Sequence, residues 1–481
     1  LGPDKYEWIP SMEREYNAHL KNQTWTLVPR PSYLPTGNQK CIELPNGTRV
    51  FLIKGLWRYR TKTGEGGKIT NYKSRWCADG RKLEFDHSET FAPIARAASI
   101  RLVAMLAASY GVRLMTGDVP NAYVKAALPS NVEIYIEQPE GFVEKGKENY
   151  VCRLNKALYG LPSAGHLWND EIVKFLIQTG FKQNTIDPCL FKLDNNGEHM
   201  IIALVVDDIL AYATTQELYE NVISRMRDKF DYKDNGEARW FLGMSIKQTY
   251  DTIEIGQEDY LKSILCEIKE NVRKRNTPGI AGEVLAPLEE GEKVMSDFPY
   301  RSVCGKLRYL TLTRPEIEFA LNQCCRFQDA PGQQYVNALL NILGYLAKFP
   351  NRNLVFHRKS LEKNSNFELT GYSDSSYEDN LPNRRSSFGY FISINDAPIA
   401  WSSRVTPTVA FSTAEAEYVA LAELLKEMIH LRSILETFEF KVSRPMIIKT
   451  DSNGTINIAS FAQITTRSKH INLRYHFVCE K

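Results

Sequence analysis

The chain has 481 residues, of which 43% are hydrophobic and 24% are charged, and its formal net charge at pH 7 is +3. These proportions are typical of globular proteins, and a chain of this length is expected to form several subdomains. No run approaches the roughly 20 apolar residues of a membrane-spanning helix. The nine cysteines lack CxxC spacing and the eight histidines form no HExxH or HxH set, which argues against a disulfide framework or a zinc site. The chain begins Leu-Gly-Pro without an initiator Met, so we expect a piece of a longer protein.

The N-terminal region predicts a helix followed by a basic β-hairpin. A helical pattern covers residues 8–20, a strand is expected over 51–60, a glycine turn at 64–67 and a second strand over 69–77. The apolar spacing becomes helical again over 99–108. The cations of the hairpin region are Lys54, Arg58, Arg60, Lys62, Lys68, Lys73, Arg75, Arg81 and Lys82. Interleaved aromatic residues make this strip a candidate phosphate-binding surface, and a solvated hairpin is the alternative.

Acidic residues follow apolar strands in the next region. Residues 113–130 predict a short strand that breaks into a helix or turn, with Asp118 after its apolar part, and residues 150–180 are mainly helical. The apolar runs 200–206 and 209–212 flank Asp207 and Asp208, which predicts a hairpin with two carboxylates at its tip. Carboxylates fixed at strand ends suit two-metal phosphoryl transfer, because bound cations make close like charges tolerable. A solvated turn is the alternative for the doublet taken alone.

The remaining chain predicts a helical region and a smaller mixed domain. Residues 259–347 are helical with a polar interruption at 276–299, and residues 351–366 are typical of a linker. Strands are then expected over 367–373, 387–394 and 398–403, an amphipathic helix over 413–438, and a fourth strand over 445–450.

Many colinear segments carry a family resemblance. In the first two thirds of the chain they include "YKSRWCADG", "ETFAPIARAASIRL", "GDVPNAYVKAAL", "VCRLNKALYGLPSAGHLW", "VVDDIL", "WFLGMSI" and "YRSVCGKLRYLTLTRPEIEFALNQCCRF". Nearer the C-terminus they include "GYSDSSY", "WSSRVTPTVAFSTAEAEYVALAE", "KTDSNGTINIA" and "SKHINLRYHF". Over nearly its whole length the sequence therefore resembles the Pol polyprotein of copia-type (Pseudoviridae) LTR retrotransposons, a family known for reverse transcriptases with a fused ribonuclease H.

The resemblance implies a polymerase site built on carboxylates. Asp118, Asp207 and Asp208 match the triad that holds two Mg²⁺ ions, for which Mn²⁺ is a substitute. Tyr123 matches the aromatic steric gate that rejects a ribose 2′-OH, with a core tyrosine as the alternative.

The same resemblance implies contacts to nucleotide and primer. Lys73 and Arg75 match basic positions that clamp the incoming triphosphate, and the run Trp240–Met244 resembles the primer grip. Two positions depart from the family pattern. Val205 stands where an aromatic residue that touches the primer end is usual, and Ser163 stands where many relatives have Gln. These departures are expected to change fidelity, processivity or nucleotide contact without removing a metal ligand.

In the C-terminal region the resemblance implies a second acidic site. Asp374 at the end of a strand, Glu417 in the helix and Asp451 after the fourth strand match the ribonuclease H core, which holds two Mg²⁺ ions. We prefer Glu417 to Glu415 because Ala420, three residues later, matches the helix pattern of that family. Solvated strand ends and a solvated helix face are the alternative for each acid taken singly.

A fourth carboxylate is expected to be missing. In the family it comes from a segment downstream of the "KHI…YHF" stretch, and no such segment occurs before Lys481. Relatives also tend to have Asp where Asn472 stands. Either the C-terminal end of the domain lies outside this sequence, or the domain has lost part of its site. We therefore expect DNA polymerisation by this chain, with RNA cleavage weak or undetectable.

The implied fold is α+β, a right-hand polymerase followed by a ribonuclease H-like domain. Fingers and palm are expected over residues 1–255, a thumb over 256–350 and the ribonuclease H-like domain over 351–481. The implied partners are an RNA template, a DNA or tRNA primer, RNA/DNA hybrids and dNTPs, with monomer and homodimer both open and no membrane. The implied location is the cytoplasm, within virus-like particles, with nuclear entry of the product complex as a further step.

Two other functions compete with a polymerase that copies RNA and DNA. A non-catalytic, retroelement-derived nucleic-acid-binding protein would be expected to lack one of the three polymerase aspartates, and all three are present. A primer-independent RNA polymerase also carries an Asp-Asp hairpin, but Tyr123 and the second acidic domain argue against it.

Overall fold

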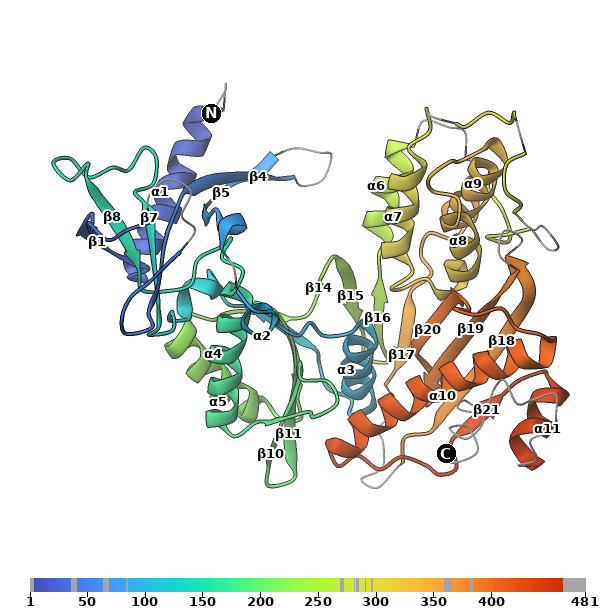
Figure 1. Cartoon of the computed structure of the whole chain (residues 1–481). Coiled ribbons are helices and arrows are strands. Elements are labelled where there is room, and N and C mark those ends of the chain that lie inside the picture. The colour runs from blue at the N-terminus through green and yellow to red at the C-terminus, as the bar shows by residue number, and fades with distance from the viewer. Residues whose placement is uncertain are drawn as a thin grey trace.

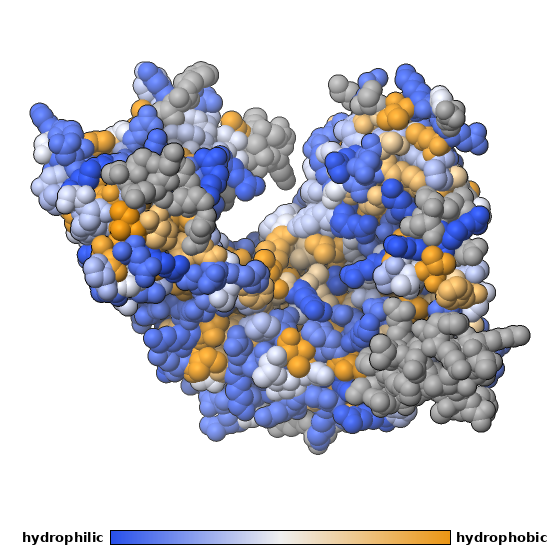
Figure 2. All heavy atoms as spheres, viewed as in Figure 1, coloured by the Kyte–Doolittle hydropathy of each residue, from blue (hydrophilic) through white to orange (hydrophobic). Residues whose placement is uncertain are grey.

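The computed structural model describes residues 4–35, 41–63, 69–83, 85–268, 272–280, 282, 285–289, 291–295, 297–358, 366–380 and 384–461. Two lobes rise from a central floor (Figure 1), and the space between them is an open concavity on the face drawn in Figure 2. Across these described residues, no helix combines the length and the apolar character needed to cross a bilayer.

The N-terminal lobe combines one helix, a five-stranded sheet and a separate hairpin. Helix α1 (Lys5–Lys21) contains the expected helical segment. The sheet has the order β1 (Trp25–Pro29), β8 (Tyr150–Leu154), β7 (Val132–Glu137), β3 (Arg49–Ile53) and β2 (Ile42–Glu43). The hairpin consists of β4 (Gly55–Thr63) and β5 (Ile69–Ala78). Short helices η2 (Gly80–Lys82) and α2 (His87–Thr90) follow.

Two sequence predictions fail in this lobe. The single strand expected over residues 51–60 is divided at Lys54, because β3 pairs in parallel with β7 whereas β4 turns away to pair with β5. Gly55 permits this turn, since a side chain there would overlap the ring of Trp76. Residues 150–154 form a strand and not the start of a helix, since β8 pairs with both β1 and β7.

The central floor is a six-stranded antiparallel sheet between helices. Its order is β13 (Lys233–Glu237), β6 (Met115–Asp118), β12 (Asp208–Ala213), β11 (Glu198–Val205), β10 (Leu190–Asn195) and β9 (Lys182–Gln183). Alternate residues of β11 pack into two different hydrophobic cores. One core also contains residues of helices α4 (Ala164–Thr179) and α5 (Gln216–Phe230), and the other contains residues of α3 (Ala97–Ser109). The short helix η3 (Ala122–Lys125) follows β6. The acidic hairpin of β11 and β12 is as predicted.

The second lobe carries a helical unit above a small sheet. The unit comprises α6 (Glu258–Glu267), α7 (Tyr300–Leu310), η4 (Pro315–Ile317), α8 (Glu318–Cys325) and α9 (Gln333–Lys348). The sheet has the order β14 (Trp240–Phe241), β15 (Met244–Gln248), β16 (Thr252–Gly256) and β17 (Leu354–His357). Strand β17 lies in the predicted linker, which is therefore wrong at this point. Leu354 and Phe356 are buried while β17 pairs with β16, so this segment belongs to the core.

The C-terminal domain, residues 366–461 in the described part of the chain, has the predicted order of three strands, a helix and a strand. Strands β20 (Ala397–Val405), β19 (Arg385–Ile394), β18 (Leu369–Asn380) and β21 (Ile447–Lys449) lie in that order, and only the β18–β21 pair is parallel. Helix α10 (Thr413–Thr437) packs on β18 and β19, and α11 (Asn453–Phe461) packs on α10.

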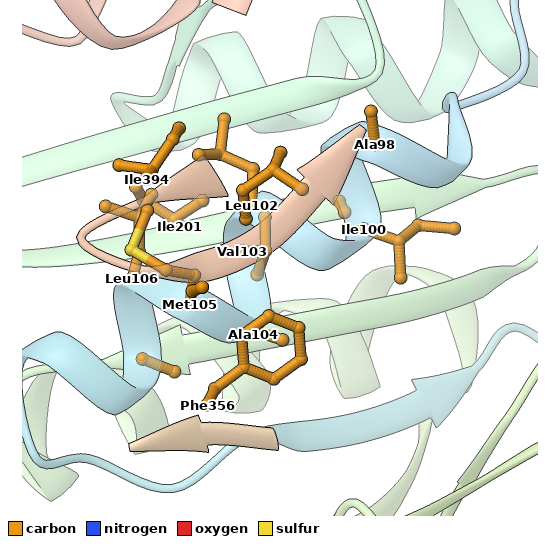
Figure 3. Packing of buried hydrophobic residues seen from close by; sticks show 14 of the residues in the cluster. Ala98, Ile100, Leu102, Val103, Ala104, Met105, Leu106, Ile201, Phe356 and Ile394 are labelled. Atoms are coloured by element: carbon orange, nitrogen blue, oxygen red, sulfur yellow. The ribbon is translucent and has the colours of Figure 1, made fainter. Parts of the chain in front are cut away.

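Helix α3 lies where the central sheet, strand β17 and the C-terminal domain meet. Its residues pack together with Ile201 of the central sheet, Phe356 of β17 and Ile394 of β19 in one continuous hydrophobic cluster (Figure 3). The C-terminal domain is therefore not a separate module on a tether. It shares a core with the central sheet, so burial of apolar surface couples the stability of the two parts.

His199 lies buried in this junction and should make stability depend on pH. Its Nε2 atom lies 3.0 Å from the Tyr212 hydroxyl, and its ring packs edge-on against Tyr110 and Phe440. Burial, and to a lesser extent the charge of Lys192, lowers the pKa of His199 from 6.5 to about 4. The unfolded chain therefore binds a proton that the folded chain excludes, so stability is complete above pH 6.5 and is lost as the pH falls toward 4.

We expect the free energy of unfolding to be lower at pH 5 than at pH 7.5 by about 2 kcal/mol through this group. Urea denaturation of the wild-type chain and of His199→Gln at both pH values measures the effect. The His199→Gln chain should lose this part of the pH dependence, and an unchanged difference between the two pH values would contradict the assignment.

Candidate active sites

Backbone pairing brings the three predicted polymerase aspartates together. In the antiparallel register, Asp118 of β6 lies opposite Asp208 of β12. The backbone N–H of Val119 donates to the carbonyl of Asp207 at 3.0 Å. Val206, in the turn before the doublet, has φ of +60°, a strained conformation for a β-branched residue. Its carbonyl accepts a 2.6 Å hydrogen bond from Trp168 Nε1 in α4, which helps to hold the turn.

Burial, with a smaller contribution from neighbouring negative charge, raises the pKa of both aspartates of the doublet. Burial, followed by the charges of Asp207 and Asp118, raises the pKa of Asp208 to about 6. Burial also raises the pKa of Asp207, although the charges of Arg75 and Lys73 oppose the shift. Carboxylates that are costly to ionise together are suited to divalent cations, which would offset the repulsion. The donor chemistry of Asp118, Asp207 and Asp208 suits hard metal ions, although their carboxylate oxygens do not all lie within 4.8 Å of one another in this structure.

Asp118 also has a neighbour that the sequence did not reveal. Asn235 Nδ2 donates to Asp118 Oδ1 at 3.1 Å from strand β13, where the pairing with β6 is irregular between Asp234 and Gly236. This irregularity is stabilised by Asp234, whose side chain accepts from Tyr219 Oη and from the backbone N–H of Gly236, each at 2.9 Å. No periodicity in the sequence marks such a bulge.

Four cations share one face of the β4–β5 hairpin. Arg58 lies opposite Arg75 and Arg60 opposite Lys73, so like charges face each other across the strands, an arrangement that is unfavourable without an anionic partner. The other face is covered by Trp8 of α1, which packs against aromatic side chains of both strands. The Nε atom of Arg75 is buried without a hydrogen-bond partner among the described residues. These features favour the phosphate-binding surface over a solvated hairpin.

Tyr123 lies beside a second aromatic residue that sequence reasoning missed. The rings of Tyr123 and Tyr159 lie 4.7 Å apart, and the guanidinium of Arg75 lies 4.5 Å from the centre of the Tyr159 ring. Burial and the negative charge of Asp207 raise the pKa of Tyr123. Tyr159 thus links the predicted steric gate to the basic hairpin. Its position within "ALYGL" is the one signal that could have drawn attention to it.

The remaining predicted contact residues differ in exposure. Ser163 and Val205 are buried, at 6% and 8% exposure, so contact of either side chain with substrate stays a prediction. Strands β14 and β15 form a hairpin over the expected primer grip, in which Trp240 is 50% exposed and Met244 is buried. An exposed indole can reach a ligand, whereas Met244 serves the core.

A second acidic cluster lies in the C-terminal domain. Asp374, Glu417 and Asp451 each offer an oxygen within 4.8 Å of the others, and within the described ranges no other acidic, His or Cys set converges as closely. Asp374 lies within β18 and not at its end as predicted, because β18 continues to Asn380. Burial is the main cause that raises the pKa of both Asp374 and Glu417.

The two glutamates of α10 have different surroundings. Glu417 Oε1 accepts from the backbone N–H of Ser375 at 3.2 Å, while its Oε2 is buried, has no hydrogen-bond partner among the residues that the structure describes, and is available to a cation. Glu415 instead accepts from the backbone N–H of Phe411 at 2.7 Å, and its own N–H donates to Ser412, the N-cap. The geometry therefore brings Glu417, and not Glu415, to Asp374.

Some predictions fall outside the described residues. These are the glycine turn at 64–67, the side chains of Lys62, Lys68 and Lys82, and the whole stretch 462–481 with Asn472.

Comparison with known proteins agrees with this geometry. A family model described as "Reverse transcriptase (RNA-dependent DNA polymerase)" matches residues 38–280. The retrovirus-related Pol polyprotein from transposon RE1 of Arabidopsis thaliana is 31% identical over 98% of the chain and 31% of its own length. That from transposon TNT 1-94 of Nicotiana tabacum is 33% identical over 99% of the chain and 35% of its own length. The chain thus spans about a third of the length of these curated relatives.

A solved structure shares the fold. It is described as "Structure of the foamy viral protease-reverse transcriptase dRH in complex with ds DNA", and it superposes with a TM-score of 0.50 at 14% identity, over 98% of this chain and 68% of the other. The predicted α+β polymerase fold and the predicted resemblance to copia-type Pol polyproteins are confirmed. The chain belongs to the reverse transcriptase (RNA-dependent DNA polymerase) family, and it is similar to the corresponding region of retrovirus-related Pol polyproteins from plant transposons.

Proposed function

We propose that the chain is a DNA polymerase that copies both RNA and DNA by two-metal nucleotidyl transfer, and that its C-terminal domain is a ribonuclease H. The observation that carries the polymerase assignment is the backbone pairing of Asp118 with Asp208, next to Asp207, within electrostatic reach of Lys73 and Arg75. Acidic residues that hold cations beside basic residues that bind phosphate are what phosphoryl transfer requires.

Each group has a distinct part in the proposed reaction. Mg²⁺ or Mn²⁺ held by the three aspartates would activate the primer 3′-OH and stabilise the leaving pyrophosphate. Arg75 and Lys73 bind the triphosphate, Arg75 by its planar fork and Lys73 as a point charge. The ring of Tyr123, supported by Tyr159, occupies the space that a 2′-OH would need.

Fingers and palm correspond to residues 1–255, the thumb to 256–350 and the ribonuclease H domain to the rest of the chain. Asp374, Glu417 and Asp451 would hold the cations for hydrolysis of the RNA strand. Hydrolysis is expected to be weak, since the carboxylates that converge within 4.8 Å among the described residues number three. The partners are an RNA template, a DNA or tRNA primer, the resulting hybrid and dNTPs, bound largely through phosphates and therefore less tightly at high salt.

Primer extension on poly(rA)/oligo(dT), with dTTP and UTP supplied separately, tests the polymerase assignment. Extension with dTTP alone is expected. Extension with UTP and without primer would indicate an RNA polymerase, and binding without extension would indicate a non-catalytic protein. A labelled RNA/DNA hybrid incubated with Mg²⁺ tests the nuclease, where rapid shortening of the RNA would contradict the expectation of weak cleavage.

Truncation of the steric gate should relax sugar selection. In Tyr123→Ala, the ratio of kcat/KM for UTP to that for dTTP is expected to rise by about 10²-fold, because the removed ring no longer excludes the extra hydroxyl. Single-nucleotide incorporation kinetics measure both values. Tyr123→Phe keeps the ring and should retain the wild-type ratio. An unchanged ratio in Tyr123→Ala would assign Tyr123 to the core instead.

A further inference from the structure

A tyrosine hydroxyl of the thumb contacts the tip of the primer-grip hairpin. Tyr309 in helix α7 donates its hydroxyl to the backbone carbonyl of Leu242, in the turn between β14 and β15. Both turn residues have positive φ, +46° at Leu242 and +74° at Gly243. A non-glycine residue in this region is conformationally costly, so the turn depends on contacts that hold it.

The fit between the turn and Tyr309 is close. A side chain at Gly243 would overlap the Tyr309 hydroxyl, so glycine is required there both for its φ and for this approach. On the thumb side, the Tyr309 ring packs edge-on against Tyr260 of α6, with centroids 5.0 Å apart and an interplanar angle of 88°. The hydroxyl is therefore held in place by packing within the helical unit, and not only by the bond that it donates.

The hairpin packs against the core at its base and, through the half-buried Leu242 side chain, at its turn. Phe241 and Met244 are buried in the core and paired with each other, whereas Trp240 is half exposed. The short β14–β15 pairing spans two residue pairs, so the tip has few bonds of its own to fix its direction. The Leu242 carbonyl receives its side-chain hydrogen bond from the thumb, which links the position of α7 to the direction of the hairpin.

We infer that Tyr309 is a positioning residue, whose hydroxyl fixes the 242–243 turn and so couples the thumb to placement of the primer terminus. The inference rests on the proposed function, because it takes the hairpin to contact the primer. Loss of the hydroxyl frees the turn without disturbing the three aspartates. Affinity for the primer–template should then weaken while affinity for the nucleotide is kept.

Tyr309→Phe removes the hydroxyl and keeps the ring. We expect KM for primer–template to rise about fivefold, the scale of one hydrogen bond, with KM for dTTP unchanged. Tyr260→Phe is the matched control, since it alters the neighbouring tyrosine in the same packed pair, and it should behave as wild type. A purely structural role would lower thermal stability without this split between the two KM values. Wild-type KM for primer–template in Tyr309→Phe overturns the inference.

A double-mutant cycle tests the contact itself. Gly243→Ala places a methyl group against the Tyr309 hydroxyl and should raise KM for primer–template by more than tenfold, with an additional cost from the positive φ. In the Gly243→Ala/Tyr309→Phe chain the overlapping oxygen is absent, so part of that loss should be recovered. Independent, multiplicative effects of the two changes overturn the coupling. If the wild-type chain fails to extend primers at all, the proposed function fails. The same cycle measured by thermal unfolding then still reports on the Gly243–Tyr309 contact.

Discussion

Replacement of Asp208 by Asn is expected to slow nucleotide addition by about 10³-fold or more, the scale on which charge-stabilising groups act in phosphoryl transfer. Asp208 lies opposite Asp118 in the sheet, and the two share a crowded site with Asp207. The substitution preserves shape and removes the charge that a cation requires. Single-turnover extension of a labelled primer, measured over a range of Mg²⁺ concentrations, gives the rate and its metal dependence.

The same variant should be more stable than wild type when metal is absent. The pKa of Asp208 is raised, so the folded chain holds a proton that the unfolded chain releases, and stability falls as the pH rises from about 4 to about 6. Above that window the ionised carboxylate opposes folding, and Asn removes this cost. After allowance for solvent screening, we expect a gain of the order of 1 kcal/mol in metal-free buffer at pH 7.5. Loss of activity in a more stable protein cannot be ascribed to unfolding.

Asp374→Asn is the reciprocal control. It removes an acid of the same type from the second cluster, and it should leave nucleotide addition within about twofold of wild type, as expected for two independent sites. Asp208→Asn should in turn leave any cleavage of a labelled hybrid unchanged. Nucleotide addition at the wild-type rate by Asp208→Asn would refute the polymerase assignment, whatever the family of the chain.

Local sequence patterns were sufficient to predict a helix or strand where an apolar segment ends at charged residues. The hairpin around Asp207 and Asp208 was predicted because two apolar runs flank an acidic doublet, and β11 and β12 follow that pattern. The same holds for α3 and α10, whose long apolar periodicity leaves few other structures open. The order of elements in the C-terminal domain was predicted for the same reason.

Predictions failed where partners far apart in the sequence decide the structure. The division at Lys54 reflects a choice between β7 and β5 as partners, and strand β17 exists because β16 lies beside it. A single sequence carries no record of such pairings. The roles of Asn235 beside Asp118 and of Tyr309 at the hairpin turn were missed because each is a single contact between distant elements, with no spacing to reveal it.

Arg101 of helix α3 contacts two other parts of the molecule. The Arg101 side chain is buried, and its guanidinium donates to the carbonyl of Ile399 in β20 at 2.7 Å and to that of Leu312, after α7, at 2.8 Å. It also stacks 3.8 Å from the centre of the Trp401 ring, and Trp401 Nε1 donates to Thr311 at 2.9 Å. One side chain thus joins helix α3, the segment after α7 and strand β20 of the C-terminal domain.

Arg101→Met is expected to lower the free energy of unfolding by about 3–5 kcal/mol, because two buried carbonyls lose their donor and the stacking on Trp401 is lost. Arg96→Met is the matched control, since Arg96 flanks the same helix with a largely exposed side chain and a 3.7 Å ion pair to Glu427, and it should cost less than about 0.5 kcal/mol. Denaturant unfolding, followed in parallel with primer extension, measures both variants. Equal stability of the two would show that the C-terminal domain is held by its apolar contacts alone. A large loss confined to Arg101→Met, together with reduced extension, would mean that the polymerase depends on the C-terminal domain as a support, whether or not that domain cleaves RNA.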